Sequence, residues 1–217
     1  MRALAVATLI GMGGLGAAAS GCAHYVGRAK PIAASAVDAH AGWVVAAPTP
    51  TVRQRGLSDC GLAALAMVAG RWGMPLTLEE AGRGVPAPTS AGLRLADLRD
   101  AARARGLTAF AIQADRATLL HELGLGRPVI VGLLRPYSAR KAISHYEVVV
   151  AMRPDDGSVA TIDPAGEGDG AWLTRRWSDL EAEWKPAGRP ALVVLGPAGA
   201  STTGELTPRR AEAAAAP

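Results

Sequence analysis

The sequence has 217 residues, of which 49% are hydrophobic and 19% are charged, which is enough for one substantial core and little more. Its formal net charge is +4, but the basic residues are scattered among acidic ones without aromatic neighbours, which argues against a nucleic-acid partner. The sequence contains two cysteines and no CxxC, HExxH or Cys/His cluster, so we expect no metal and no cofactor.

Residues 1–22 have the three regions of a bacterial export signal. Arg2 precedes an apolar stretch from Ala3 to Leu15, which is short for a membrane span, and small residues follow. The segment Ala19-Ser20-Gly21-Cys22 is similar to a lipobox, in which Cys22 becomes the lipidated first residue; ordinary cleavage nearby is the alternative. We therefore expect an exported protein of the cell envelope that is attached to the membrane through a lipid anchor, on the periplasmic face in a Gram-negative cell.

Two low-complexity segments flank the expected domain. Residues 23–51 are small, contain proline and have little periodicity, which predicts a flexible tether. Residues 197–217 are rich in Ala, Thr, Pro and Gly, which predicts a disordered tail. The sequence therefore predicts one folded domain over residues 52–196.

The first half of this domain has the apolar spacing of helices. From Asp59 the apolar residues recur at helical intervals as far as Gly70, which predicts a buried helix of about three turns. Three further helices are expected: one after the capping box Thr77-Leu78-Glu79-Glu80, one from about Leu93 to Arg105, and one from the N-cap Asp115 to Leu123.

The second half is dominated by β-branched apolar runs. Strands are predicted over residues 129–134, 146–152, 159–162 and 191–195, with a further strand over 108–112 and a short helix over 178–184. The densest basic run, from Arg135 to Lys141, is interpreted as a solvated loop. Helices followed by strands favour an α+β domain with a largely antiparallel sheet over an alternating parallel fold.

Cys60 stands at the N-terminal end of the first predicted helix. Unpaired backbone N–H groups and the positive end of the helix dipole favour the thiolate there, which is the nucleophilic form of cysteine. Gly61 is expected to leave room for a substrate backbone beside the thiol. Taken alone, a cysteine in such a helix is better interpreted as an inert, buried structural residue.

Three other residues favour a nucleophilic role for Cys60. His145 precedes the strand predicted from residue 146, so its imidazole can stand at a sheet edge. Asp163 ends the next strand, and if the two strands are neighbours its carboxylate can orient the imidazole and stabilise its cation. Gln54 lies six positions before Cys60, where its amide N–H and the backbone N–H of Cys60 can face a tetrahedral oxyanion. Each residue alone also fits an ordinary capping, turn or loop role.

These residues resemble the peptidase C39 family, the papain-like bacterial cysteine peptidases known as leader-cutting domains of peptide exporters. The resemblance extends over residues 53–195 and is carried by Gln54, Asp59-Cys60-Gly61, Ala63, Leu65, Ala66, Met67, His145-Tyr146 and Asp163-Pro164. It implies a papain-like cysteine peptidase fold, in which the nucleophile helix packs on the sheet. It also implies that Cys60 is the nucleophile, His145 the general base and acid, Asp163 its orienting partner and Gln54 the oxyanion residue.

The expected function is hydrolysis of a peptide bond in an exported peptide or protein, linked to processing or secretion. Familiar family members are fused to a membrane transporter and act on the cytoplasmic side, whereas this sequence carries an export signal, so specificity for a Gly-Gly leader is not carried over. Secretion machinery is a second candidate partner. Two alternatives remain: a peptidoglycan amide hydrolase of another papain-like family, and a non-catalytic peptide-binding accessory of secretion.

Overall fold

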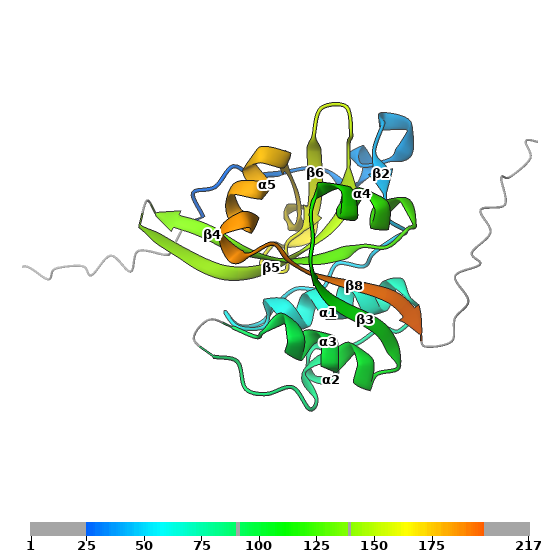
Figure 1. Cartoon of the computed structure of the whole chain (residues 1–217), viewed down its shortest axis with the longest axis vertical. Coiled ribbons are helices and arrows are strands. Elements are labelled where there is room, and N and C mark those ends of the chain that lie inside the picture. The colour runs from blue at the N-terminus through cyan, green and yellow to red at the C-terminus, as the bar shows by residue number, and fades with distance from the viewer. Residues whose placement is uncertain (1–24, 90–91, 139, 198–217) are drawn as a thin grey trace, which may run out of the picture.

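The computed structural model describes residues 25–89, 92–138 and 140–197 (Figure 1). The expected export signal with Cys22, and the expected tail beyond Pro197, lie outside the described residues. The helices are α1 (Cys60–Arg71), α2 (Leu78–Gly82), α3 (Leu95–Ala104), α4 (Arg116–Gly124) and α5 (Trp177–Trp184). The strands are β1 (Lys30–Pro31), β2 (Val44–Val45), β3 (Leu107–Gln113), β4 (Val129–Ser138), β5 (Lys141–Met152), β6 (Ser158–Ile162), β7 (Trp172–Arg176) and β8 (Pro190–Pro197).

All strands belong to one antiparallel sheet. Its order is β1-β7-β6-β5-β4-β8-β3, and β2 pairs with the far end of β5. Helices α1, α2 and α3 lie on one side of this sheet, and α4 and α5 lie on the other (Figure 1). The α+β fold with a largely antiparallel sheet is therefore confirmed.

Alternation along the central strands separates the core into two layers. Ile130 of β4 and Val148 of β5 pack with α1 and α3, whereas Val131 and Val149 pack with α4 and α5. This follows from the period of two in a strand, which sends successive side chains to opposite faces. Because both faces are covered, β4 and β5 are apolar at nearly every central position, as their sequence runs predict.

Helix α1 is buried on most sides, as its sequence predicts. Its 12 residues include the fully buried Leu65, Met67 and Val68, which pack against the central strands. Alanines occupy much of the rest of the helix surface and allow close approach of its neighbours. A helix held in this way fixes the position of its first residue, Cys60, relative to β5.

The expected tether over residues 23–51 is corrected for the part that the structure describes. β1 pairs with β7 and β2 with β5, and the side chain of Trp43 is 4% exposed within the core. Ile32 and Val37 also pack against this core. These segments have little local periodicity because they are stabilised by strands more than 100 residues away in the sequence. The folded part therefore begins before Val52.

Strands β4 and β5 are longer than predicted and form a hairpin, at whose end Ser138 pairs with Lys141. The sequence placed His145 at the head of a strand, but it lies inside β5, opposite Leu133 of β4. The basic run from Arg135 to Lys141 is not a solvated loop throughout, because Arg135 belongs to β4 and is 4% exposed. Polar residues interrupt the apolar pattern at this end of the hairpin, so the sequence pattern did not predict that both strands extend this far.

No helix within the described ranges has the length and apolar character required to cross a membrane.

Candidate active site

Cys60 is the first residue of α1, and the loop before it is closed by local hydrogen bonds. The backbone N–H of Gly56 donates to Oδ2 of Asp59 at 2.9 Å, and Nε2 of Gln54 donates to the carbonyl of Gly56, also at 2.9 Å. Cys60 is 4% exposed and is a free cysteine. The thiol is therefore held at the N-terminus of a buried helix, where the sequence predicts it.

The thiol of Cys60 lies against a part of β5 that has no pairing with β6. β6 ends at Ile162, opposite Val148, so the edge of β5 that includes His145 and Tyr146 has no pairing with β6. The thiol of Cys60 is hydrogen bonded to the His145 side chain and also interacts with the backbone N–H of Tyr146. Because β6 ends at Ile162, the N-terminus of α1 can approach this part of β5.

Asp163 directly follows β6 and contacts His145 from the other side. Its Oδ1 lies 2.7 Å from Nε2 of the imidazole and also accepts the backbone N–H of Ala165 at 2.8 Å. The backbone N–H of Asp163 donates to the carbonyl of Ala171 at 2.7 Å, which fixes this turn. His145 and Asp163 are 7% and 5% exposed. The structure therefore brings Cys60, His145 and Asp163 together in that order.

The environment favours a charged thiol and a charged imidazole. Burial alone would raise the pKa of Cys60, but the hydrogen bond and charge of His145, helped by the backbone N–H groups of Tyr146 and Gly61, lower it below its ordinary value. Burial alone would lower the pKa of His145, but hydrogen bonds to Asp163 and Cys60 raise it to about 9. Both shifts favour the same charged pair, a thiolate with an imidazolium.

Asp163 stays ionised because it has cationic partners on both oxygens. Burial would raise the pKa of its carboxyl group, but the hydrogen bond and charge of His145 and the charge of Arg135 hold that pKa well below its usual range. Nη1 of Arg135 donates to Oδ2 at 2.6 Å. An ionised Asp163 accepts the imidazole N–H and directs the other ring nitrogen of His145 toward the thiol.

Gln54 is placed beside this group through its backbone. Its backbone N–H donates to the carbonyl of Pro164 at 2.8 Å, directly after Asp163. Its Nε2 uses one hydrogen on Gly56, which leaves the second free of a partner among the described residues, and its Oε1 is buried without a hydrogen bond. The structure thus brings Gln54 to the same region, with its amide plane fixed by the loop before Cys60.

Gly61 has a different role from the one expected. A Cβ atom at this position would lie 3.0 Å from Cδ1 of Leu98 and 3.1 Å from Cδ2 of Tyr146. The glycine therefore allows α1 to approach α3 and β5 closely, and the space beside it is filled by protein side chains rather than left for a substrate. Tyr146 is fixed in this contact by its hydroxyl, which donates to the carbonyl of Leu93 at 2.9 Å.

Arg135 is the residue of this region that the sequence analysis missed. Alternation places residues 129, 131, 133 and 135 on one face of β4, and the first three are buried apolar residues of the α5-side core. That continuation of the buried face is the signal that distinguishes Arg135 from the exposed basic residues after it.

Three side chains of the site have the chemistry of metal ligands. His145, Glu147 and Asp163 offer ligand atoms within 4.8 Å of one another. The guanidinium of Arg135 contacts both carboxylates, at 2.6 Å from Asp163 and 3.7 Å from Glu147, and the imidazole contacts Asp163. The carboxylates thus have cationic partners already, and a divalent ion would have to displace a buried arginine.

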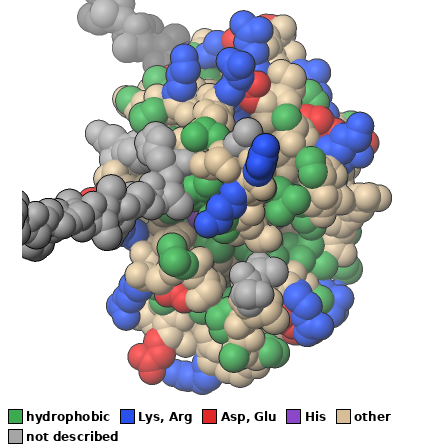
Figure 2. All heavy atoms as spheres, turned by 90° about the vertical axis from the view of Figure 1, so that its left-hand side faces the viewer, with side chains coloured by type: hydrophobic (Ala, Val, Ile, Leu, Met, Phe, Trp, Pro, Cys, Tyr) green, Lys and Arg blue, Asp and Glu red, His purple; other side chains and the backbone are tan. Residues whose placement is uncertain are grey.

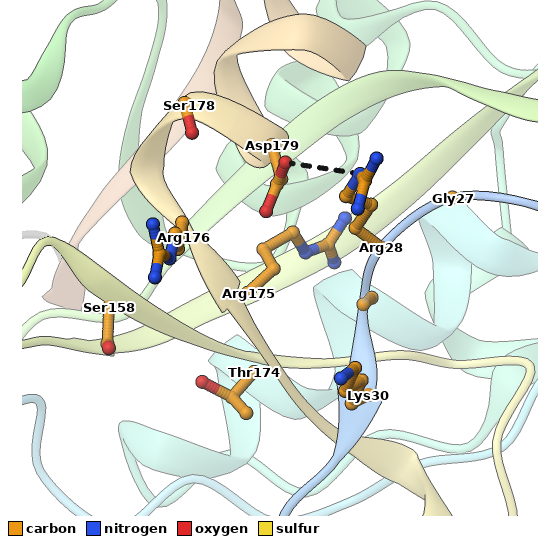
Figure 3. Close-up of a pocket in the computed structure, with 10 residues that line it drawn as sticks. Gly27, Arg28, Lys30, Ser158, Thr174, Arg175, Arg176, Ser178 and Asp179 are labelled. Carbon is orange, nitrogen blue, oxygen red and sulfur yellow. Dashed lines mark ion pairs between the residues drawn. The ribbon is translucent and has the colours of Figure 1, made fainter.

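Two cavities of the described residues are lined by residues other than Cys60, His145 and Asp163. One of about 810 Å³ lies between β7, the start of α5 and the N-terminal segment, where Arg28 pairs with Asp179 at 3.9 Å (Figure 3). Another, of about 510 Å³, is lined by Arg53, Glu167 and Trp172, close in sequence to Gln54 and Asp163. On the face drawn in Figure 2, basic side chains occur in several separate places between hydrophobic ones.

Comparison with known proteins identifies the family to which these features correspond. The family model of the peptidase C39 family matches residues 48–187. No curated protein sequence is significantly similar to the chain.

Solved structures with the same fold include two peptidases of transporters. The peptidase domain of Streptococcus ComA, a bifunctional ABC transporter of a quorum-sensing pathway, is 23% identical with a TM-score of 0.53, covering 67% of this chain and 96% of that domain. A double-glycine-motif protease from an AMS/PCAT transporter, in complex with its leader peptide, is 18% identical with a TM-score of 0.53, covering 69% and 93%. A C39-like peptidase from Bacillus anthracis is 15% identical with a TM-score of 0.58, covering 70% and 97%. These likenesses show a shared papain-like fold.

Proposed function

Since this chain belongs to the peptidase C39 family, we propose that it is a cysteine peptidase with Cys60 as its nucleophile. The observation that carries this proposal is the buried line of Cys60, His145 and Asp163, in which the pKa of the thiol is lowered and that of the imidazole is raised to about 9. A structural cysteine in apolar surroundings would have a raised pKa instead. The residues supply a nucleophile, a proton donor and an orienting carboxylate without a cofactor.

The reaction follows from the charges of these groups. The Cys60 thiolate attacks the carbonyl carbon of the scissile peptide bond, and the carbonyl oxygen becomes an oxyanion. His145 then gives its proton to the leaving amine as the C–N bond breaks, which leaves a thioester on Cys60. Neutral His145 next removes a proton from a water molecule, the hydroxide attacks the thioester, and the thiolate and imidazolium are restored. Asp163 stabilises the imidazolium in both stages.

Gln54 is proposed to donate its free amide hydrogen to the oxyanion. We expect Gln54→Ala to lower kcat by about 10²- to 10³-fold, because one preorganised donor is lost from the transition state. The pH dependence of Cys60 alkylation should not change, since Gln54 is not a partner of the thiol or imidazole. Steady-state kinetics and alkylation rates on the same preparation measure both effects, and an unchanged kcat would remove Gln54 from the mechanism.

The pH profile of kcat/KM should be bell-shaped with an alkaline limb near pH 9. The thiolate is present above the lowered pKa of Cys60, and the imidazolium is present below the raised pKa of His145, about 9, so activity lies between the two. Hydrolysis of an uncharged fluorogenic peptide measures this profile. An alkaline limb near the ordinary histidine value of about 6.5 would show that Asp163 does not support the imidazolium.

We propose that the enzyme acts at the cell envelope on an exported peptide or protein. The support is the export signal in residues 1–22 with its lipobox-like ending at Cys22, which predicts a lipid anchor. Metabolic labelling with an alkyne fatty acid should mark the wild-type chain and leave the Cys22→Ser chain unmarked. Secretion machinery of the same envelope is the second proposed partner.

A peptide probe and two substrates test the proposal against its alternatives. A peptidyl vinyl sulfone should label Cys60 in the folded chain, whereas a binding module without catalysis would leave that thiol unlabelled. Peptides from exported proteins and purified peptidoglycan, offered separately, distinguish a peptidase from a cell-wall amide hydrolase. Release of peptidoglycan fragments without peptide cleavage would contradict the proposed function.

A further inference from the structure

The second oxygen of Asp163 has a single partner among the described residues, and it is a buried arginine. Oδ1 is shared by His145 and the backbone N–H of Ala165, while Oδ2 accepts Nη1 of Arg135 at 2.6 Å. The side chains of Arg135 and Asp163 are 5% and 7% exposed. Water therefore has little access to replace the guanidinium on Oδ2.

Arg135 is itself fixed from two other directions. Its guanidinium carbon lies 4.2 Å from the centre of the Tyr25 ring, a cation–π contact, and its Nε lies 3.7 Å from Oε1 of Glu147. The Tyr25 hydroxyl donates to Glu183 at 2.6 Å, and burial raises the pKa of Tyr25 to about 12, so it remains a protonated donor. The N-terminal segment, expected to be a tether, thus contributes Tyr25, which packs on Arg135, the residue that contacts the carboxylate of Asp163.

Glu147 belongs to a continuous buried set of charges that ends at α5. Its Oε2 accepts the hydroxyl of Thr161 at 2.7 Å and also contacts Nη2 of Arg175, whose Nη1 donates to Glu183 at 2.9 Å. Figure 3 shows the side chain of Arg175 extending from β7 toward the N-terminal segment. Arg135 and Arg175 are therefore comparable: each is buried, each contacts Glu147, and only Arg135 contacts Asp163.

Loss of Arg135 has two opposing consequences for His145. Removing a nearby positive charge would favour the imidazolium directly. It would also leave Oδ2 of Asp163 buried and unpartnered, and the carboxylate would respond by taking a proton or turning away. Either response removes the support that His145 receives through the 2.7 Å contact with Oδ1. Because that contact is a direct hydrogen bond, whereas Arg135 makes no hydrogen bond or ion pair with His145 among the described residues, the second consequence should dominate.

On the basis of the proposed function, we propose that Arg135 is a positioning residue of the active site: it keeps Asp163 ionised and oriented toward His145, and Tyr25 and Glu147 hold it in place. Arg135 contacts neither Cys60 nor His145 in any hydrogen bond or ion pair of the described residues. It acts on the thiolate through the line Arg135, Asp163, His145, Cys60.

Alkylation of Cys60 as a function of pH tests this role without knowledge of the substrate. Iodoacetamide reacts with the thiolate, and mass spectrometry of the tryptic peptide Gly56–Arg71 follows Cys60 separately from Cys22 in the full chain. In Arg135→Gln the pH at which the alkylation rate of Cys60 is half-maximal should rise by about one unit or more. The reason is that Asp163 would no longer stabilise the imidazolium of His145, and the imidazolium stabilises the thiolate. Arg135→Lys keeps the charge but loses the planar fork, so its rise should be smaller.

Arg175→Gln is the matched control, because it removes an equally buried arginine from the same Glu147 and should leave the alkylation profile unchanged. An unchanged or lowered midpoint in Arg135→Gln would overturn the proposal, as would an equal rise in Arg175→Gln. Circular dichroism establishes which variants fold; if Arg135→Gln does not, Arg135→Lys decides, and a profile identical to wild type overturns the proposal. A wild-type midpoint near the ordinary cysteine value of about 8.5 would instead contradict the proposed function itself.

Discussion

Cys60→Ala is expected to abolish peptide hydrolysis, with a loss of kcat of about 10⁶-fold, and to leave the fold intact. The size of the loss follows from the role proposed for the thiolate, because removal of the nucleophile from a catalytic unit typically costs this much. The change deletes one sulfur atom from a helix terminus whose next residue, Gly61, is packed closely against Leu98 and Tyr146. Steady-state kinetics measure the loss of kcat, and thermal unfolding measures whether the fold is intact.

The second cysteine provides the control for that experiment. Cys22→Ser removes the other thiol and the proposed lipid site, and it should retain hydrolysis of a soluble peptide. Hydrolysis that persists in Cys60→Ala and disappears in Cys22→Ser would contradict the assignment of the nucleophile. Loss of activity in both variants with loss of the cooperative thermal transition would point to a folding defect instead.

Asp163→Asn is expected to lower kcat by about 10⁴-fold and to destabilise the domain. The amide cannot stabilise the imidazolium as the carboxylate does, and it favours the wrong orientation or tautomer of His145. It also leaves the buried Arg135 without the carboxylate at 2.6 Å, and breaking one partner of a buried ion pair commonly costs about 3 to 5 kcal/mol. Kinetics and denaturant unfolding separate the two effects.

Glu183→Gln is the matched control for Asp163→Asn. Glu183 is 5% exposed, as Asp163 is, and pairs with a buried arginine, Arg175, at 2.9 Å. It should lower stability while kcat stays within about threefold, because it has no contact with His145. An equal loss of kcat in both variants would mean that the loss reflects general disruption of the buried charges and not the orientation of His145.

The loss of folding stability at acid pH should reflect protonation of Asp163. The pKa of Asp163 in the folded state lies below its ordinary value of about 3.9, so its contribution is complete above that value and is lost as the pH falls toward the folded pKa. The contribution of His145 has the opposite sign. Its raised pKa of about 9 means that stability is complete below about 6.5 and is lost as the pH rises through 9.

The helices and central strands could be predicted because their signals are local. Thr77 and Glu80 form the capping box that the sequence predicts, with the Glu80 N–H donating to the Thr77 hydroxyl at 3.1 Å. Asp115 caps α4 by accepting the Thr118 N–H at 2.8 Å. Strands β1 and β2 have no such signal, because two-residue strands exist only through pairing with β7 and β5. Local patterns therefore underestimated the N-terminal extent of the fold.

The sequence alone determined the candidate residues of the proposed site, since Cys60 at a helix start, His145, Asp163 before a proline and Gln54 can be recognised by type and spacing. Only the tertiary structure decided how they meet, because β6 ends at Ile162 and exposes the edge of β5 that Cys60 reaches. It also decided that Arg135 is buried on Asp163 rather than solvated. An ionisable group's environment is set by neighbours that are distant in the chain, and these neighbours determine its charge.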